Sequence, residues 1–230
     1  MHSTTRWHVM EDSATVAAEA TRRVLAASRT AIAARGVFRI VLAGGHTPTQ
    51  AYRMLAETET DWTGWQIYFG DERCLPPDHA ERNSLAVAQA WLDRVAIPAE
   101  NVHPIPAELG AEAAAEVYAP LVSAALPFDL VILGLGEDGH TASLFPGQVH
   151  SPTASVHPVH GAPKPPSDRV SLSAVALSSA REILILVTGA GKRSAVTAWK
   201  NGGPLPVATV GGTSGVDVLI DRDAYADPTP

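Results

Sequence analysis

Apolar residues along the chain fall into two patterns: short continuous runs, and longer stretches in which they recur with a helical period. Continuous runs of this length are typical of strands buried on both faces of a parallel sheet. They cover residues 37–42, 65–69, 130–133, 182–188 and 216–221, with a shorter run at 169–173. The repeated order of strand, loop and helix predicts a mostly parallel sheet covered by helices, in a single α/β domain over residues 1–230.

The longest helix is predicted for residues 12–35, whose apolar side chains form one stripe. Asp12 or Ser13 can cap its start, and Gly36 can end it. Pro120 should kink or split a further alanine-rich helix. The remaining helices are expected at about 49–55, 84–95 and 109–126, with a last one that ends near Trp199.

The segment 148–167 is rich in proline and lacks a clear period. We therefore expect a long loop, of the kind that often serves as a lid. Its histidines are His150, His157 and His160. They have no carboxylate or cysteine neighbours in the sequence, which favours loop residues over metal ligands.

Composition narrows the function. Hydrophobic residues make up 46% of the 230 residues and charged residues only 18%, and the formal net charge is −7. A negative net charge argues against partners such as nucleic acid or an anionic membrane. An anionic small molecule would then need a locally basic pocket.

Cellular context follows from the cysteine count and from the chain's start. Cys74 is the single cysteine, so no internal disulfide can form, as expected in a reducing cytoplasm. The first residues lack the apolar segment of a signal peptide, and no apolar run approaches a membrane span. We expect a cytoplasmic protein.

Candidate chemistry is densest directly after the run 130–133. Three glycines, Gly134, Gly136 and Gly139, let the backbone turn sharply, and they bring Asp138 and His140 close to the end of the strand. Open α/β sheets bind ligands at the carboxyl ends of their strands, and an imidazole exchanges protons near neutral pH.

Two other interpretations of this turn remain open. The spacing Gly-x-Gly-x-x-Gly matches a dinucleotide fingerprint, but Pro146 follows instead of a full helix, and the next acid comes only at Asp168. In the other interpretation, Asp138 and His140 only satisfy backbone groups within the turn.

A second candidate site follows the run 37–42. Gly44 and Gly45 precede a helix start, where free N–H groups and the positive end of the helix dipole bind anions. Thr47 is a good N-cap, and Gln50 completes a capping box. This pattern favours a phosphate cradle. The alternative is that the glycines only turn the chain and Thr47 only caps the helix.

Charged residues follow two more of the predicted strands. Asp71 and Arg73 belong to an Asp-Glu-Arg triplet that can supply a general base and a bidentate phosphate partner, although such residues are often solvated loop residues. Lys192 follows the run 182–188 near a helix start, where it can hold a phosphate as a point charge. The surrounding sequence is not a P-loop.

These separated motifs occur in an order that resembles the 6-phosphogluconolactonase family. The motifs are LAGGHTP at 42–48, FGDER at 69–73 with Asn83 and Ser84 further on, GLGEDGHTASLFPG at 134–147, RVSLS at 169–173 and GAGK at 189–192. The resemblance extends from about Leu42 to Asp221. It implies a modified Rossmann-like α/β fold, with a mostly parallel sheet flanked by helices on both faces.

The resemblance also implies a reaction, the hydrolysis of 6-phospho-D-glucono-1,5-lactone to 6-phosphogluconate in the pentose phosphate pathway. His140 would act as general base and then as general acid. Either Asp138 or Asp71 would assist it, and backbone N–H groups around Gly136–Gly139 would stabilise the oxyanion. No metal or cofactor is expected. The substrate phosphate would be held by Gly44, Gly45, His46, Thr47, Arg73, Arg169 and Lys192. Of these, His46 departs from the family pattern, which usually has serine there.

Two competing functions come with the same resemblance. Related glucosamine-6-phosphate deaminases carry a glutamate for ring opening where this chain has Phe145, and a phenyl ring cannot accept a proton. Sugar-phosphate sensors of similar fold carry a DNA-binding helix-turn-helix, which this sequence lacks. The expected partner is therefore a phosphorylated sugar lactone, with neither nucleic acid nor membrane. The expected state is a monomer or a weak homo-oligomer.

Overall fold

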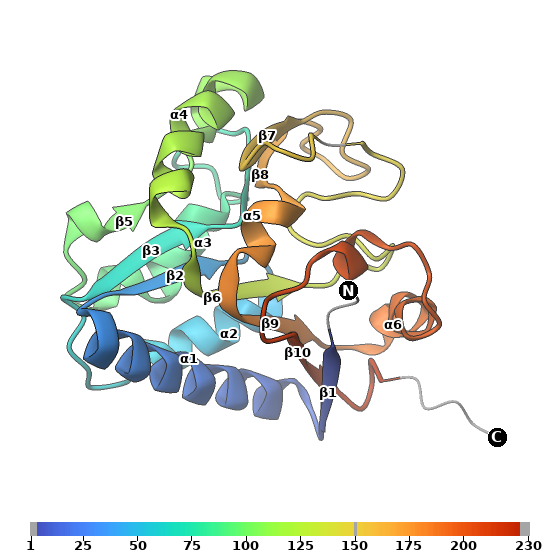
Figure 1. Ribbon diagram of the computed structural model, residues 1–230, viewed down its shortest axis with the longest axis horizontal. Coiled ribbons are helices and arrows are strands. Elements are labelled where there is room, and N and C mark those ends of the chain that lie inside the picture. The colour runs from blue at the N-terminus through green and yellow to red at the C-terminus, as the bar shows by residue number, and fades with distance from the viewer. Residues whose placement is uncertain (1–3, 150, 226–230) are drawn as a thin grey trace.

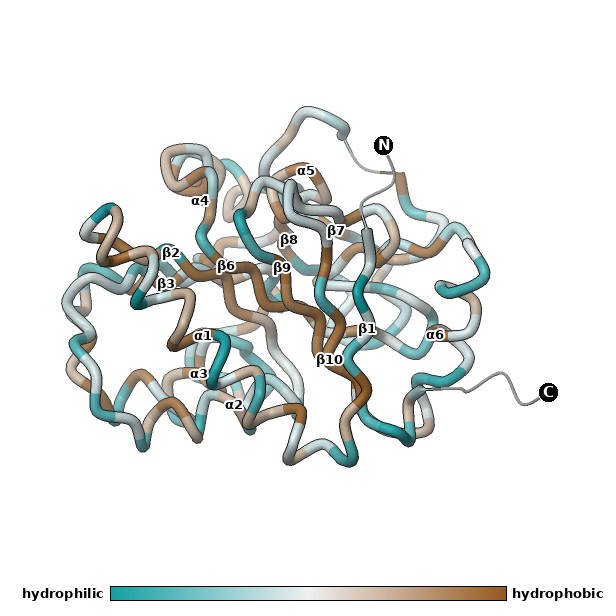
Figure 2. The backbone as a smooth tube through the Cα atoms, turned by 60° about the horizontal axis from the view of Figure 1, so that its bottom comes forward, coloured by the Kyte–Doolittle hydropathy of each residue, from teal (hydrophilic) through white to brown (hydrophobic). Residues whose placement is uncertain are grey.

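The computed structural model describes residues 4–149 and 151–225. Its main sheet has seven strands, and all of their pairings are parallel (Figure 1). In spatial order they are β1 (Thr5–Met10), β10 (Val216–Asp221), β9 (Ala180–Val187), β6 (Phe128–Gly134), β2 (Phe38–Leu42), β3 (Trp65–Phe69) and β5 (Val102–His103). The central strands are strongly hydrophobic (Figure 2), as expected for a parallel sheet that is covered on both faces.

Helices cover the sheet on both sides (Figure 1). α1 (Ser13–Arg35) and α2 (His46–Leu55) pack together along one face. α4 (Ala111–Ala125) and the short α5 (Ala174–Ser178) lie on the other side. α3 (Asn83–Ala90) packs beside α2, and α6 (Arg193–Lys200) follows β9. The predicted α/β fold with one mostly parallel sheet is confirmed.

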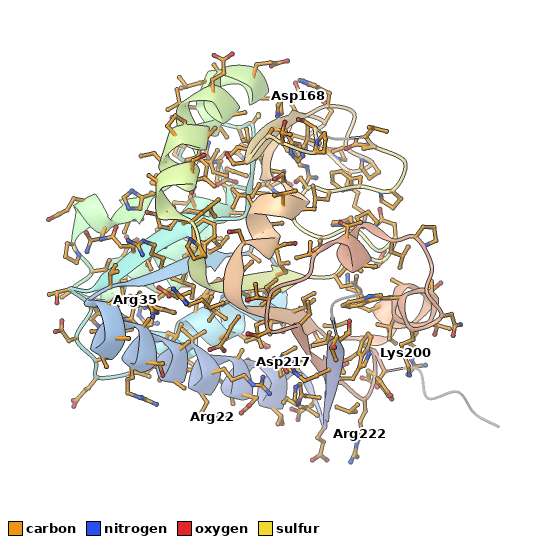
Figure 3. The ribbon with its side chains drawn as sticks, viewed as in Figure 1. Arg22, Arg35, Asp168, Lys200, Asp217 and Arg222 are labelled. Carbon is orange, nitrogen blue, oxygen red and sulfur yellow. The ribbon has the colours of Figure 1, made fainter. Side chains whose placement is uncertain are left out.

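The first long helix agrees closely with its prediction. Asp12 is the N-cap of α1 and accepts a hydrogen bond from the Thr15 N–H at 2.8 Å, and Gly36 ends the helix in the left-handed conformation with φ 73°. Near this end, Arg35 donates to the buried carboxylate of Asp129 at 2.5 Å. Arg35 is the last residue of α1 (Figure 3), and Asp129 lies at the amino-terminal end of β6. This ion pair therefore holds the end of α1 against the start of β6.

A second, three-stranded sheet was not predicted. β4 (Asp71–Arg73), β8 (Arg169–Leu172) and β7 (Val156–Val159) pair antiparallel in this order. The expectation of a loop throughout residues 148–167 is therefore wrong, because this segment contains β7. Of the two interpretations of residues 71–73, the solvated loop is excluded, because these residues form β4 and Asp71 and Glu72 are buried. β4 and β7 are too short for a local period to mark them, and β4 pairs with a strand that is far away in the sequence.

Three further corrections concern single elements. β1 was not predicted. The helix expected to reach Val95 ends at Ala90, because Trp91 leaves the helical conformation and packs against Trp62 and Trp65 with ring centroids 5.6 and 5.7 Å apart. Pro120 lies inside α4 without splitting it. The carbonyl four residues earlier belongs to the exposed Glu116, so solvent can replace the lost hydrogen bond.

The histidines of segment 148–167 differ from one another. His157 is buried in β7, so it is not a loop residue, whereas His160 lies just beyond that strand and is exposed. His150 and the chain end at 226–230, where we expect fraying, lie outside the described residues. Within the described ranges, no helix is long and apolar enough to cross a membrane.

Candidate active site

A cavity of about 400 Å³ opens at the carboxyl ends of four neighbouring strands, β9, β6, β2 and β3. After β2 the chain continues toward one edge of the sheet through β3 and β5, whereas after β6 it continues toward the other edge through β9 and β10. Such a reversal of direction creates a crevice in which α/β proteins bind ligands. The topology therefore positions the cavity.

Nine of the ten residues predicted for the site line this cavity. They are Gly44, Gly45, His46, Thr47, Asp71, Arg73, His140, Arg169 and Lys192. The tenth, Asp138, is not a lining residue but contacts one. Motifs from both halves of the chain therefore meet in one place, as expected from strand ends that lie side by side.

Asp138 contacts the imidazole of His140. Oδ1 of Asp138 lies 2.5 Å from Nδ1 of His140, and it also accepts from the His140 backbone N–H at 3.1 Å. Burial alone would raise the pKa of Asp138, but these two hydrogen bonds hold it below its ordinary value. An ionised carboxylate only accepts, so the proton between the two side chains is on Nδ1, and in the neutral imidazole Nε2 carries the lone pair that can accept a proton.

Gly136 brings its backbone close to that imidazole. A Cβ atom at Gly136 would lie 2.0 Å from Nδ1 of His140, so only glycine fits here. The N–H of Gly136 donates to the carbonyl of His140 at 2.7 Å, and the N–H of Gly139 donates to the carbonyl of Gly136 at 3.1 Å. Both N–H groups are engaged within the loop, so the predicted oxyanion role is wrong for these two glycines.

Asp71, the other candidate carboxylate, is buried and also lines the cavity. Its Oδ2 accepts from the Ser143 hydroxyl at 2.6 Å, and its Oδ1 accepts from the Asn83 amide at 3.3 Å. Within the described residues, Asp71 forms no hydrogen bond with His140. Of the two carboxylates proposed to assist His140, the geometry thus pairs the imidazole with Asp138.

The start of α2 forms another part of the wall. Gly45 is the N-cap residue with φ 103°, a value that favours glycine, and no side chain caps this helix. The capping role predicted for Thr47 is therefore wrong: its hydroxyl lies 2.5 Å from the hydroxyl of Thr188 at the end of β9. Because the first N–H groups of the helix remain available, an anion can bind there.

The cavity is locally basic although the chain is acidic. Its lining includes four cationic side chains, Arg73, Arg169, Lys164 and Lys192, and two carboxylates, Asp71 and Glu137. Burial, together with the nearby Arg73 charge, lowers the pKa of Arg169. An anionic ligand would offset that repulsion between the two arginines, which is the electrostatic environment that a phosphate group requires.

Arg169 also orders the segment that precedes it. Its guanidinium donates to the carbonyls of Lys164 at 2.9 Å and Pro166 at 3.2 Å, and it lies over the ring of Phe145 at 5.5 Å. The segment thereby carries Lys164 to the cavity, where its Nζ lies 3.7 Å from Oε2 of Glu137.

Sequence reasoning missed Lys164, Glu137, Thr188 and the site role of Asn83, all of which line the cavity. Glu137 lies in the turn after the run 130–133 and Thr188 ends the run 182–188, but neither belongs to a recognised acid–base or phosphate-binding pattern. A usable signal for Lys164 was its place among prolines shortly before Arg169, since a rigid segment can hold a cation near a neighbouring one.

Other ligands are less compatible with these residues. The glycine-rich turn after β6 is followed by turns and bends rather than by the helix that a dinucleotide fingerprint requires. Across residues 4–149 and 151–225, no group of three or more histidine, cysteine or acidic side chains is arranged to hold a metal ion.

Comparisons with known proteins place this geometry in context. The sequence matches the profile described as glucosamine-6-phosphate isomerases/6-phosphogluconolactonase over residues 11–219. A 6-phosphogluconolactonase of Mycobacterium leprae is 35% identical over 237 residues, which cover 95% of this chain and 96% of that protein. One of Mycobacterium tuberculosis is 37% identical over 240 residues, with the same coverage of 95% and 96%.

Solved structures show the same relationship. The crystal structure of 6-phosphogluconolactonase from Thermotoga maritima superposes with a TM-score of 0.89 at 29% identity, and the match covers 95% of this chain and all of that one (100%). A monomeric glucosamine-6-phosphate deaminase superposes with a TM-score of 0.81 at 21% identity, covering 95% of this chain and 98% of that one. At that identity the likeness shows the shared fold alone.

Proposed function

Because the chain belongs to the glucosamine-6-phosphate isomerase and 6-phosphogluconolactonase family, we propose that it hydrolyses 6-phospho-D-glucono-1,5-lactone to 6-phosphogluconate, with His140 as the proton-transferring residue. The two mycobacterial relatives, which are 35% and 37% identical and match over nearly their whole length, are 6-phosphogluconolactonases. The observation that carries the residue assignment is the His140–Asp138 pair at the wall of a basic cavity.

The mechanism follows from the state of the imidazole. Nε2 of His140 removes a proton from a water molecule, whose oxygen attacks the lactone carbonyl carbon. The tetrahedral intermediate then breaks its bond to the ring oxygen, and the imidazolium returns the proton to that oxygen. Asp138 stabilises the imidazolium through Nδ1–H. Proton transfer by a positioned side chain of this kind contributes about 10²–10⁴-fold to a rate.

The other end of the substrate is bound by charge and by backbone N–H groups. The start of α2, from Gly45 to Thr47, presents free donors, and Arg169 and Lys192 supply positive charge. Arg73 lies on the same wall, although its Nη1 already donates to the carbonyl of Glu81 at 2.5 Å. These groups hold the phosphate while the lactone carbonyl reaches His140.

The deaminase alternative is disfavoured by Phe145. This side chain is buried, and its ring centroid lies 4.8 Å from that of His140. The position where a deaminase needs a proton-accepting carboxylate is therefore occupied by an apolar ring. We retain the expected cytoplasmic location as part of the proposal, since the free thiol of Cys74 fits a reducing compartment. We also retain the expected monomeric or weakly homo-oligomeric state.

The test is lactone hydrolysis with freshly generated 6-phosphogluconolactone and subtraction of the spontaneous rate. Wild-type protein and His140→Ala are measured in parallel, with glucosamine 6-phosphate as a second substrate. We expect rapid lactone loss by the wild type and a kcat lower by about 10²–10⁴-fold in the variant, with a small change in KM. Release of ammonia from glucosamine 6-phosphate would overturn the assignment, as would an unchanged kcat in the variant.

A further inference from the structure

The Asn83 side chain lies between two walls of the cavity that come from different sheets. Its Nδ2 donates to the backbone carbonyl of Asp71 at 3.0 Å and to Oδ1 of the same residue at 3.3 Å. Its Oδ1 lies against Gly44, in the turn that follows β2. Asn83 is 5% exposed, so a single buried amide touches both the candidate phosphate turn and a candidate acid.

The orientation of this amide is determined by its partners. Both Asp71 atoms that it contacts are acceptors, so the NH₂ group must face Asp71 and the amide oxygen must face Gly44. The amide therefore cannot rotate by half a turn without placing two acceptors against each other. A side chain with one allowed orientation can set a distance between the groups on its two sides.

The side chain of Asn83 leaves no room for a Cβ atom at position 44. A Cβ atom at position 44 would lie 2.0 Å from Oδ1 and 2.5 Å from Cγ of Asn83. The φ angle of Gly44 lies outside the left-handed range, unlike that of Gly45 at 103°. An alanine at position 44 would therefore clash with the Asn83 amide, whereas its backbone conformation would not be strained.

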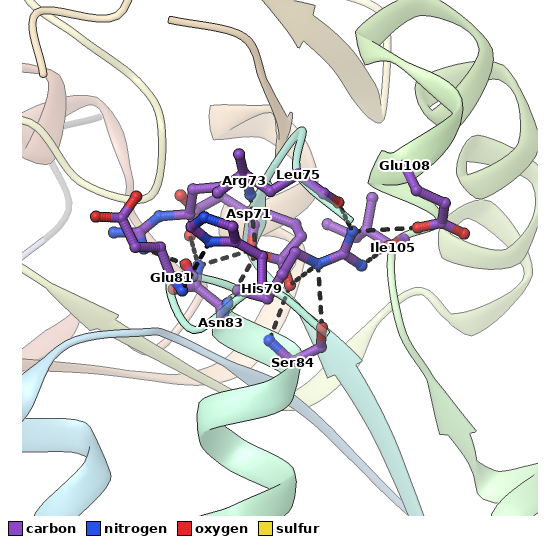
Figure 4. Close-up of polar contacts among 11 residues, drawn as sticks. Asp71, Arg73, Leu75, His79, Glu81, Asn83, Ser84, Ile105 and Glu108 are labelled. Carbon is purple, nitrogen blue, oxygen red and sulfur yellow. Dashed lines mark hydrogen bonds and ion pairs between the residues drawn. The ribbon is translucent and has the colours of Figure 1, made fainter. Parts of the chain in front are cut away.

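A buried ion pair fixes the main chain of Asn83. The carboxylate of Glu72, which is fully buried, accepts from the N–H groups of Asn83 and Ser84, each at 2.8 Å (Figure 4). Arg82 pairs with Glu72 at 3.2 Å, and it also donates to the carbonyls of Leu75 and Ile105. The start of α3 is thus anchored to β4 independently of any ligand.

The contacts continue from Asp71 to the loop that carries the proposed base. Oδ2 of Asp71 accepts from the Ser143 hydroxyl at 2.6 Å, and Ser143 follows His140 by three residues. A continuous path of contacts therefore runs from Gly44 through Asn83, Asp71 and Ser143 to the loop of His140.

We propose that Asn83 is a positioning residue that sets the distance between the phosphate-binding turn at Gly44 and the reacting end of the cavity at His140. This inference rests on the proposed function. It assigns to Asn83 a specificity role: the phosphate of the substrate and its lactone carbonyl are a fixed number of bonds apart, and the amide holds their two binding regions at the matching separation. Neither contact of Asn83 requires it to touch the substrate.

The test is a double-mutant cycle with Gly44→Ala, Asn83→Ala and the combined variant. Affinity for 6-phosphogluconate is measured by titration calorimetry, and kcat/KM is compared for the phosphorylated lactone and for unphosphorylated glucono-1,5-lactone. The matched control is Asn101→Ala, which removes an amide that donates to the Thr63 carbonyl at 3.0 Å on the surface. The calorimetric arm does not require turnover, so it remains informative if the proposed reaction fails.

We expect each single variant to weaken binding of the phosphorylated ligand by about tenfold and the combined variant to be no weaker than Gly44→Ala, because the shorter side chain of Asn83→Ala leaves room for the new Cβ. We also expect Asn83→Ala to lower the preference for the phosphorylated lactone by about tenfold, whereas a general loss of stability would reduce kcat/KM for both lactones equally. The control should resemble the wild type.

Two results would overturn the proposal: additive losses of about a hundredfold in the combined variant, or an Asn83→Ala variant whose lactone preference equals that of the control. If Asn83→Ala cannot be purified folded, Asn83→Ser replaces it in the same cycle, because serine also removes the amide oxygen from Gly44. Thermal melts of all variants identify any loss of folded protein.

Discussion

Oδ1 of Asp138 lies 2.5 Å from Nδ1 of His140, and only Gly139 separates the two residues in the sequence. The acid and the base are therefore positioned by one turn and not by two elements that must fold together. Gly136 completes the arrangement, because any larger residue there would collide with the imidazole. Such a pair is formed locally, and the surrounding sheet only has to direct it into the cavity.

The first prediction concerns the contribution of Asp138 to catalysis. In Asp138→Asn the amide can donate to Nδ1, which favours the tautomer whose proton is on Nε2 and so removes the free base. We expect kcat for lactone hydrolysis to fall by about 10²–10³-fold with little change in KM. The measurement is steady-state kinetics beside Asp71→Asn, which removes the other candidate carboxylate. A larger loss of kcat in Asp71→Asn would reassign the assisting role.

The second prediction concerns Lys164 and its ion pair with Glu137. Lys164→Met removes one of the cations of the lining, so we expect KM for the phosphorylated lactone to rise by about three- to tenfold with a smaller change in kcat. Glu137→Gln removes the competing carboxylate and should leave KM unchanged or lower it.

The control for this pair is Lys200→Met. Lys200 is the last residue of α6 (Figure 3), and its Nζ lies over the ring of Tyr225. It is not among the lining residues of the cavity. A rise in KM that is equal in Lys164→Met and Lys200→Met would reflect net charge alone and would contradict a local role for Lys164.

The third prediction concerns the buried pair of Arg82 and Glu72, whose side chains are 3% and 0% exposed. Arg82→Met leaves the Glu72 carboxylate buried without its cation, so we expect the free energy of unfolding to fall by about 3–5 kcal/mol. The measurement is chemical denaturation. Arg22→Met is the matched control, since Arg22 is 64% exposed in its pair with Glu19, and loss of such a surface pair costs about 0–1 kcal/mol. Equal losses in both variants would contradict the prediction.

Much of the fold could be predicted because its strands are continuous apolar runs. The strands at Trp65–Phe69 and Val216–Asp221 agree with their predictions to the residue. Strand ends that lie side by side then bring the predicted site residues together. The family and its reaction are supported by relatives across nearly the whole chain, whereas the roles of the individual side chains stay predictions.

The missed features depend on contacts between distant residues. Thr47 has the sequence context of a helix cap, but its hydroxyl pairs with Thr188, which is 141 residues away. Lys164 is an exception, because the residue that holds its carbonyl, Arg169, follows only five residues later, and the prolines around Lys164 were a usable signal. The strands β4 and β7 are each stabilised by pairing with β8. No local pattern records the contact of Thr47 with Thr188 or the pairing of β4 with β8, so a single sequence cannot reveal them.

The fourth prediction concerns His160, whose imidazole contacts one carboxylate next to β8 and another in α4. Its Nδ1 lies 3.0 Å from Oδ1 of Asp168 at the start of β8, and its Nε2 lies 2.9 Å from Oε1 of Glu112 in the first turn of α4. Figure 3 shows Asp168 at the periphery of the molecule. The hydrogen bond to Asp168, followed by the charge of Glu112, raises the pKa of His160.

The direction of the pH effect follows from this raised pKa. A group whose pKa is higher in the folded than in the unfolded state stabilises the fold fully at pH values below its unfolded-state pKa, which is about 6.5 for histidine. This stabilisation is lost as the pH rises through the folded-state pKa. His160→Gln should therefore lower Tm at acidic pH, and the difference from the wild type should vanish at alkaline pH. His79→Gln is the control, since His79 forms no ion pair in the described part of the chain. A Tm difference that persists unchanged into the alkaline range would show that His160 acts by packing rather than by its charge.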